Sequence, residues 1–176
     1  MENKPKKTLL TKITVVIALS AVMAALVTVA TFIIQIYVPA TGGYINFGDI
    51  MIFVSALTFG PVIGGISGGV GSSLSDILSG YAFTYAPFTL IIKGFEGTIA
   101  GLISNRKNVW RDITAVILAG VEMVSGYFLA EFYPLHIGWA ALTEVPGNIS
   151  QIAVGGAIGI PVALILRRRL PKTWLK

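Results

Sequence analysis

Five ionisable side chains lie inside long apolar stretches of the chain, namely Asp49, Asp76, Lys93, Glu96 and Glu122. An ionised group in such a stretch is costly unless it is paired or faces water, so each is a candidate for function. Lys93 and Glu96 are three residues apart and can meet across one helical turn. Two interpretations follow. The charges form a buried ion network that fixes helix register, or they bind a ligand, and Lys93 is able to do both.

Uncharged polar side chains lie near the same stretches. Asn46 lies at the start of the apolar stretch that ends near residue 60. Asn148 and Gln151 share one helical face at the start of the last stretch, 145–166. Amides donate and accept hydrogen bonds without the cost of a charge, so with neighbouring tyrosines they suit a flat, polar ring. Alternatively, the two amides of the last stretch bond between helices. The aromatic residues, which are Tyr44, Tyr81, Tyr85, Tyr127 and Trp139, also fit a membrane-interface belt.

The composition indicates an integral membrane protein. Of 176 residues, 55% are hydrophobic and 12% are charged, and the mean hydropathy is +0.81. Residues 13–48, 50–75 and 145–166 carry no charged side chain, and each range is long enough to cross a hydrocarbon layer of about 30 Å. The absence of Cys and the single His argue against disulfides and metal clusters. We therefore expect no enzyme, no catalytic residues and no metal ligands.

Hydrophobic runs and breakers predict an all-α fold of six transmembrane helices in a single domain, 1–176. The first helix follows Lys12 in an apolar run that continues to Val38. The second starts near Asn46 and ends at Gly60-Pro61. The remaining four are expected at about 62–79, 87–104, 113–132 and 145–166. Short basic tails, 1–12 and 167–176, flank the bundle.

The distribution of positive charge predicts the orientation. Every Lys and Arg except Lys93 falls in the N-terminal arm, the loop after the fourth helix or the C-terminal tail. Six spans place these segments on one side, which the positive-inside rule makes cytoplasmic. The opposite loops contain no Lys or Arg. Topology thus explains the net charge of +5 without nucleic acid, and the expected surroundings are a lipid bilayer.

Small residues recur at helical spacing and predict close helix packing. Gly60, Gly64, Gly68 and Ser72 are each four residues apart, and the pairs Gly97/Gly101 and Gly155/Gly159 repeat this spacing. Such faces associate by van der Waals contact in lipid, and we interpret these three as internal. Ala21 and Ala25 form a similar pair on the first helix, where an internal contact and an external partner explain the spacing equally well.

Four segments together resemble a known family. They are 43–49 (GYINFGD), 59–61 (FGP) with the glycine-rich helix after it, 86–97 (APFTLIIKGFEG) and 146–151 (PGNISQ). They resemble the substrate-binding S components of energy-coupling factor (ECF) vitamin transporters. The similarity extends over most of the chain and is closest to the riboflavin-type family, whose members are also assigned to hydroxymethylpyrimidine and pyridoxine-like vitamins.

The resemblance implies a multi-pass protein of the prokaryotic cell membrane. It would capture a vitamin at the outer side and then dock on a transmembrane coupling subunit driven by two ATPase subunits. ATP would be used by those partners, so this chain needs no cofactor. Ala21 and Ala25 match the docking surface of the family's first helix. The family pattern assigns substrate binding to Asn46, Tyr85, Lys93, Glu122, Asn148 and Gln151, and we expect Asp49, Asp76 and Glu96 to be structural.

An ion- or proton-coupled secondary transporter of a small polar solute is the main alternative. In that case the five intramembrane charges would form a relay, and inverted repeats would be expected. The two halves of the chain, 1–79 and 80–176, show no convincing match. A membrane enzyme ranks last, because the cytoplasmic loops offer mainly Lys, Arg and Asp112.

Overall fold

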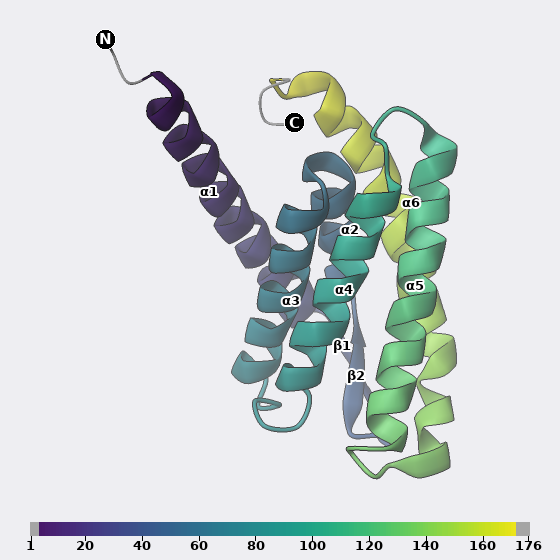
Figure 1. The fold of residues 1–176 in the computed structure, drawn as a ribbon. Coiled ribbons are helices and arrows are strands. Elements are labelled where there is room, and N and C mark those ends of the chain that lie inside the picture. Colours follow the sequence, from purple (N-terminus) through teal and green to yellow (C-terminus); the bar gives the residue numbers. More distant parts are fainter. Residues whose placement is uncertain (1–3, 172–176) are drawn as a thin grey trace.

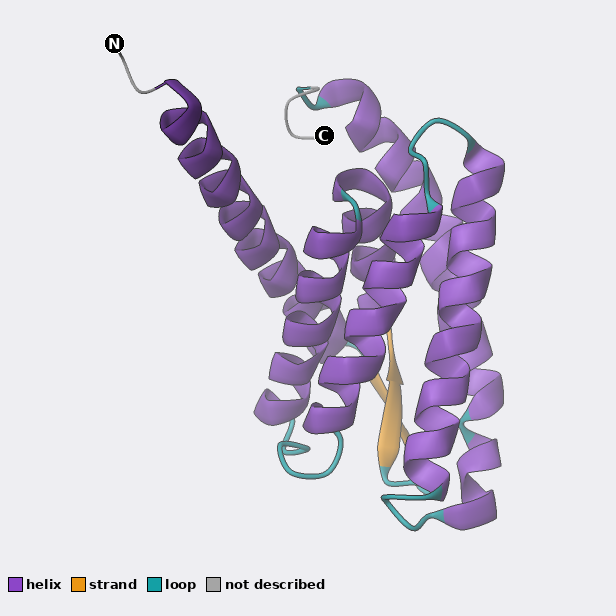
Figure 2. Ribbon diagram, in the orientation of Figure 1, coloured by secondary structure: helices purple, strands orange, loops and turns teal. Residues whose placement is uncertain are grey.

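The computed structural model describes residues 4–171 and consists of helices with one short hairpin (Figure 2). The elements in chain order are α1 (Lys4–Ile33), β1 (Gln35–Val38), β2 (Gly43–Asn46), α2 (Gly48–Phe59), α3 (Pro61–Leu78), α4 (Ala86–Ile103), α5 (Val109–Phe132), the 3-10 helix η1 (Gly138–Thr143) and α6 (Val145–Arg169). The first turns of α1, the α4–α5 loop and the last turns of α6 lie at one end of the bundle (Figure 1). The α3–α4 loop, the hairpin turn and η1 lie at the other.

Six α-helices are present among the described residues, as predicted. Four helical segments are long and apolar enough to cross a membrane, namely Thr11–Ile33, Ala86–Ile103, Val109–Phe132 and Gly138–Arg169. The helix α2 has 12 residues, which at 1.5 Å per residue fall well short of a hydrocarbon layer of about 30 Å. The helix α3 has 18 residues, but its many glycines and serines lower its hydropathy.

The hairpin corrects the prediction of a first helix that continues to Val38. The helix α1 ends at Ile33, and Gln35–Val38 pairs antiparallel with Gly43–Asn46. The segment before Pro39 is rich in β-branched and aromatic residues, which favour a strand. Gly42 has φ +72°, a conformation that a turn requires and that glycine adopts readily. The fold is therefore mostly helical, as predicted, with one β-hairpin that was not predicted.

Glycine residues allow the backbones of α3 and α4 to pack in direct contact. A Cβ atom added to Gly97 would lie 2.5 Å from the carbonyl carbon of Gly64, and one added to Gly68 would lie 2.5 Å from the carbonyl oxygen of Lys93. On α6, Gly159 approaches Phe53 of α2 in the same way. The three glycine faces are thus internal, as predicted. Ala21 and Ala25 are exposed, so within this chain their spacing is not explained by internal packing.

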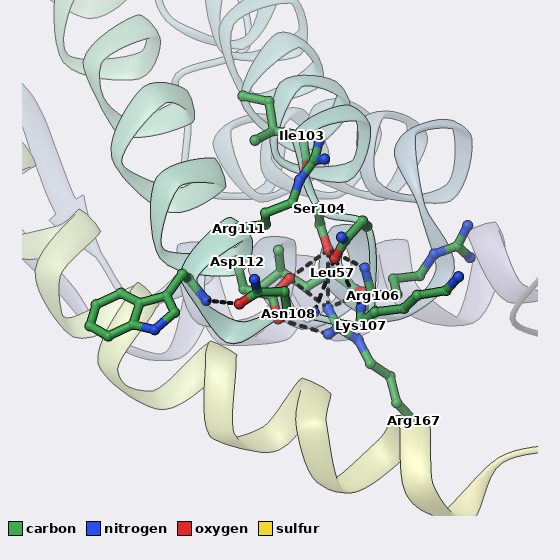
Figure 3. Close-up of polar contacts among 11 residues, drawn as sticks. Leu57, Ile103, Ser104, Arg106, Lys107, Asn108, Arg111, Asp112 and Arg167 are labelled. Atoms are coloured by element: carbon green, nitrogen blue, oxygen red, sulfur yellow. Dashed lines mark hydrogen bonds and ion pairs between the residues drawn. The ribbon is translucent and has the colours of Figure 1, made fainter.

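At the end of the bundle that carries the α4–α5 loop, Arg167 of α6 contacts α2 and the start of α5 (Figure 3). The Leu57 carbonyl lies four residues before Pro61, which has no N–H to donate to it. Arg167 replaces that donor, with Nε 2.9 Å and Nη2 2.5 Å from Leu57 O. The guanidinium also binds Asp112, with Nη1 2.7 Å from Oδ2 and Nη2 3.1 Å from Oδ1. Arg167, predicted to lie in a tail, therefore belongs to α6, which ends at Arg169, and is half-buried.

Candidate ligand-binding site

A buried ion network lies where α2, α4 and α6 meet. Lys93 of α4 is 1% exposed. Its Nζ atom pairs with Asp49 in the first turn of α2 and lies 2.9 Å from Glu96 Oε2. Gln151 of α6 donates from Nε2 to Asp49 Oδ2 at 2.9 Å. Because two carboxylates offset the ammonium charge, Lys93 is paired within the protein.

Gln151 also fixes the hairpin to α6. Its Oε1 accepts the backbone N–H of Asn46 at 2.7 Å. The Asn46 side chain in turn accepts the N–H of Gly48 at 2.8 Å, which turns the chain into α2. A side chain on Gly48 would collide with the Thr31 hydroxyl. The hairpin end is therefore positioned by hydrogen bonds to α6 and by close contact with α1.

A small polar pocket of about 20 Å³ lies beside this network. It is lined by Thr31, Tyr44, Asn46, Ser72, Asp76, Tyr85, Thr89, Lys93, Tyr127, Glu144, Asn148 and Gln151. Each of the long helices, or the residue directly before it, contributes to this lining. A volume of this size is on the order of one water molecule, so a ring-sized ligand requires side chains or the hairpin to move.

Tyrosine side chains form much of the pocket wall. Tyr44 donates to Asp76 Oδ1 at 2.5 Å, and Tyr127 donates to Thr89 Oγ1 at 3.0 Å. Tyr127 also presents its ring to Lys93, whose Nζ lies 5.7 Å from the ring centroid. Burial, and the carboxylates of Glu131 and Glu144, raise the pKa of Tyr85. Its hydroxyl therefore stays protonated and able to donate a hydrogen bond.

Five of the six residues assigned to substrate binding line this pocket: Asn46, Tyr85, Lys93, Asn148 and Gln151. Glu122 does not. It is half-buried on α5, with Oε2 buried and without a hydrogen-bond partner among the described residues. Asp76, which we expected to be structural, lines the pocket, whereas Asp49 and Glu96 lie behind Lys93. The binding roles themselves stay predictions.

Three lining residues were not anticipated from the sequence: Thr31, Ser72 and Thr89. Helical spacing gives a signal for two of them. Ser72 precedes Asp76 by four residues on α3, and Thr89 precedes Lys93 by four on α4, so each shares a face with a charged residue. Thr31 has no charged residue at helical spacing on α1, so its sequence gives no comparable signal. The hairpin brings the end of α1 to the site.

A polar pocket enclosed by membrane-spanning helices is typical of proteins that bind or move small solutes across a bilayer. Residues 11–168 match the family described as "ECF-type riboflavin transporter, S component". The chain belongs to this family, as the resemblance of its motifs predicted. It is a multi-pass membrane protein of a transporter family rather than of an enzyme family.

A relative from Pyrococcus woesei is also similar. It is described as "Uncharacterized protein in gap 3'region" and is 43% identical over 145 residues. The alignment covers 82% of this chain and 96% of the relative.

Proposed function

We propose that this chain is the substrate-capturing subunit of an ATP-driven vitamin uptake transporter, and that the pocket around Lys93 binds the vitamin. The observation that carries the proposal is the pocket itself, where polar side chains from both ends of the sequence converge inside apolar helices. Family membership supports a vitamin ligand and a partnership with ECF transmembrane and ATPase subunits. ATP is consumed by those partners, and this chain uses no cofactor.

The ligand class follows from the size and polarity of the pocket. Hydroxymethylpyrimidine, a pyridoxine-like vitamin and riboflavin are the candidates. With a volume of about 20 Å³, the site must expand for any of them. A single pyrimidine or pyridine ring requires less expansion than a three-ring isoalloxazine. Tyrosine faces, amides and the Asp76 carboxylate suit a ring with several hydrogen-bonding groups, so we favour a single-ring vitamin.

The proposed topology has six crossings with both termini in the cytoplasm, and the short α2 makes its crossing together with β2, the strand that directly precedes it. Arg106, Lys107 and Arg111 belong to the α4–α5 loop and the start of α5, at the same end of the bundle as the first turns of α1 and the last turns of α6 (Figure 1). Positive charge at one end marks the cytoplasmic side. The pocket residues Tyr85 and Glu144 lie in connections at the opposite end, so the vitamin enters from outside.

The exposed face of α1 is the proposed docking surface for the coupling subunit. Ala21 and Ala25 are exposed, whereas Ala24 between them is 7% exposed and packs inward. Small side chains allow another helix to approach closely in lipid. Because the pocket is lined by other residues, docking and vitamin binding are separable.

Replacement of Ala21 or Ala25 by tryptophan is expected to abolish vitamin uptake while leaving vitamin affinity unchanged, because the bulky ring blocks the approach of a partner helix. The measurements are uptake by cells that express the whole transporter and equilibrium binding by the purified subunit. Leu26→Trp is the matched control, since Leu26 is also exposed on α1 but lies on a different face. Normal uptake by both alanine variants would remove the docking assignment.

Asn148→Ala is expected to weaken vitamin binding by about 1–3 kcal/mol, the cost of an unsatisfied buried hydrogen-bonding group. Asn148 lines the pocket and is 5% exposed, and Asp76→Asn offers a comparison at the opposite wall. The affinity is measured by titration of the purified protein, and thermal unfolding serves as the control for folding. An unchanged affinity would assign Asn148 to packing.

Native mass spectrometry of the purified protein, followed by identification of any small molecule released, tests the proposal directly. A stoichiometric vitamin supports it, and failure of all three vitamin classes to bind contradicts it. Uptake measurements separate the proposal from ion coupling. Uptake lost on ATP depletion at a maintained proton gradient supports the ECF mechanism, and uptake abolished only by an uncoupler supports the ion-coupled alternative.

A further inference from the structure

Two buried glutamates face each other at the end of the bundle opposite the α4–α5 loop. Glu131 lies in the last turn of α5 and is 0% exposed, and Glu144 directly precedes α6 and is 3% exposed. The two carboxyl groups interact with each other. The ligand pocket is lined by Glu144 but not by Glu131.

Hydroxyl and carbonyl oxygen atoms lie around this pair. The Thr41 hydroxyl, from the hairpin turn, donates to Glu144 Oε1. The Tyr85 hydroxyl lies 3.1 Å from the Thr41 carbonyl oxygen and 3.5 Å from Glu131 Oε1. The hairpin backbone also approaches closely, because a Cβ atom on Gly43 would collide with Glu144 Oε1. Carboxylate, hydroxyl and carbonyl oxygens therefore converge from the hairpin, α5 and the starts of α4 and α6.

Lys and Arg are absent from the connections at this end of the bundle, which hold the single histidine, His136. Segments 39–42, 80–85 and 133–143 contain no Lys or Arg. The ion pairs of Lys93 and Arg167 are made with Asp49, Glu96 and Asp112. Two hydroxyl donors thus face four carboxylate oxygens, and among the described residues Glu131 Oε2 is buried with no donor other than a proton shared with Glu144. A second buried carboxylate near the first is strongly unfavourable unless a proton or a cation lies between them.

We propose that Glu131 and Glu144 bind a hard divalent cation of the calcium type, with the carbonyl and hydroxyl oxygens of Thr41 completing its shell. All the available ligands are oxygen atoms, which such ions prefer, and flexible coordination of six to eight oxygens is characteristic of Ca²⁺. No group of three or more His, Asp or Glu side chains forms a metal site among the described residues. With only two carboxylates, the expected dissociation constant is on the order of 10⁻⁴ to 10⁻³ M.

The cation has a mechanical consequence for the vitamin site. Thr41 belongs to the turn between β1 and β2, and Tyr85 and Glu144 line the ligand pocket. An ion held by Glu131, Glu144 and Thr41 therefore ties the hairpin turn to α5 and α6 beside the pocket wall. This inference does not depend on the identity of the vitamin and can be tested without it.

Thermal unfolding of the full-length protein in lipid nanodiscs, with and without millimolar calcium chloride, tests the site. Calcium is expected to raise the unfolding temperature of the wild type by several degrees, because an ion that binds only the folded state stabilises it. Glu131→Gln and Glu144→Gln are each expected to lose most of this increment. Asp112→Asn is the matched control: it removes a buried carboxylate at the other end of the bundle and keeps the increment.

Isothermal titration with calcium chloride supplies a second measurement. One calcium ion per chain is expected, with affinity reduced about tenfold or more in either glutamine variant because carboxylate ligands set the affinity. If a glutamine variant fails to fold, Thr41→Val tests the same coordination shell. This substitution removes the Thr41 hydroxyl and is expected to weaken calcium binding. The inference is overturned if calcium neither binds to nor stabilises the wild type, which would mean that the carboxyl pair holds only a proton. It is equally overturned if the variants that fold respond to calcium as the wild type does.

Discussion

Lys93→Met is expected to lower the free energy of unfolding by about 3–5 kcal/mol, the typical cost of removing one partner from a buried ion pair. The ammonium group is the cation between Asp49 and Glu96, both 0% exposed. Without it, Asp49 retains the amide donor of Gln151, but Glu96 loses its charged partner. Methionine conserves much of the side-chain volume, so the loss reports charge rather than a cavity.

The variant set for this prediction separates charge from packing. Lys107→Met is the matched control, because Lys107 is exposed in the α4–α5 loop, and its expected cost is within about 0.5 kcal/mol. In the triple variant Lys93→Met, Asp49→Asn, Glu96→Gln no charge remains in this network, and we expect much of the loss to be recovered. Reversible unfolding in detergent micelles gives the free energies. A loss of less than about 1 kcal/mol in the single variant would show that water screens these charges.

The helix pattern could be predicted from the sequence because the bilayer imposes long apolar runs and the breakers between them are strong. Predicted and observed boundaries agree closely for α3 and α4, each of which has a proline within its first two residues. The hairpin could not be predicted in this way. Residues 34–38 are as apolar as the helix before them, so hydropathy does not separate the two segments, and the strand depends on pairing with Gly43–Asn46. That pairing depends on the turn at Gly42, which is a local conformational requirement rather than a hydropathy signal.

Only part of the site could be predicted from the sequence. A polar group inside an apolar helix is readily recognised in sequence, but the direction it faces depends on helix rotation. On α5, Met123, Tyr127 and Ala130 share one inward face. Glu122 is about 140° around the helix from Tyr127 at 100° per residue, so it does not reach the pocket. Asp76 reaches it because Tyr44, brought back by the hairpin, meets it there.

Arg167→Leu is expected to destabilise the protein by about 3–5 kcal/mol, since it leaves Asp112 buried without its cation. It also removes the donor that replaces the missing N–H of Pro61 at the Leu57 carbonyl. Arg167→Lys is expected to recover only part of the loss. A lysine ammonium is a point charge and does not reproduce the planar fork that binds Asp112 and the carbonyl together.

Arg168→Leu is the control for this second prediction, because Arg168 is the next residue on α6 and is exposed. Its expected change in unfolding free energy is within about 0.5 kcal/mol. The same unfolding assay compares all three variants, and Asp112→Asn in the Arg167→Leu background is expected to restore stability by removing the unpaired carboxylate. If Arg167→Lys equals the wild type, charge alone holds this end of the bundle. If Arg167→Leu and Arg168→Leu behave alike, the contacts of Arg167 in Figure 3 do not stabilise the junction of α2, α5 and α6.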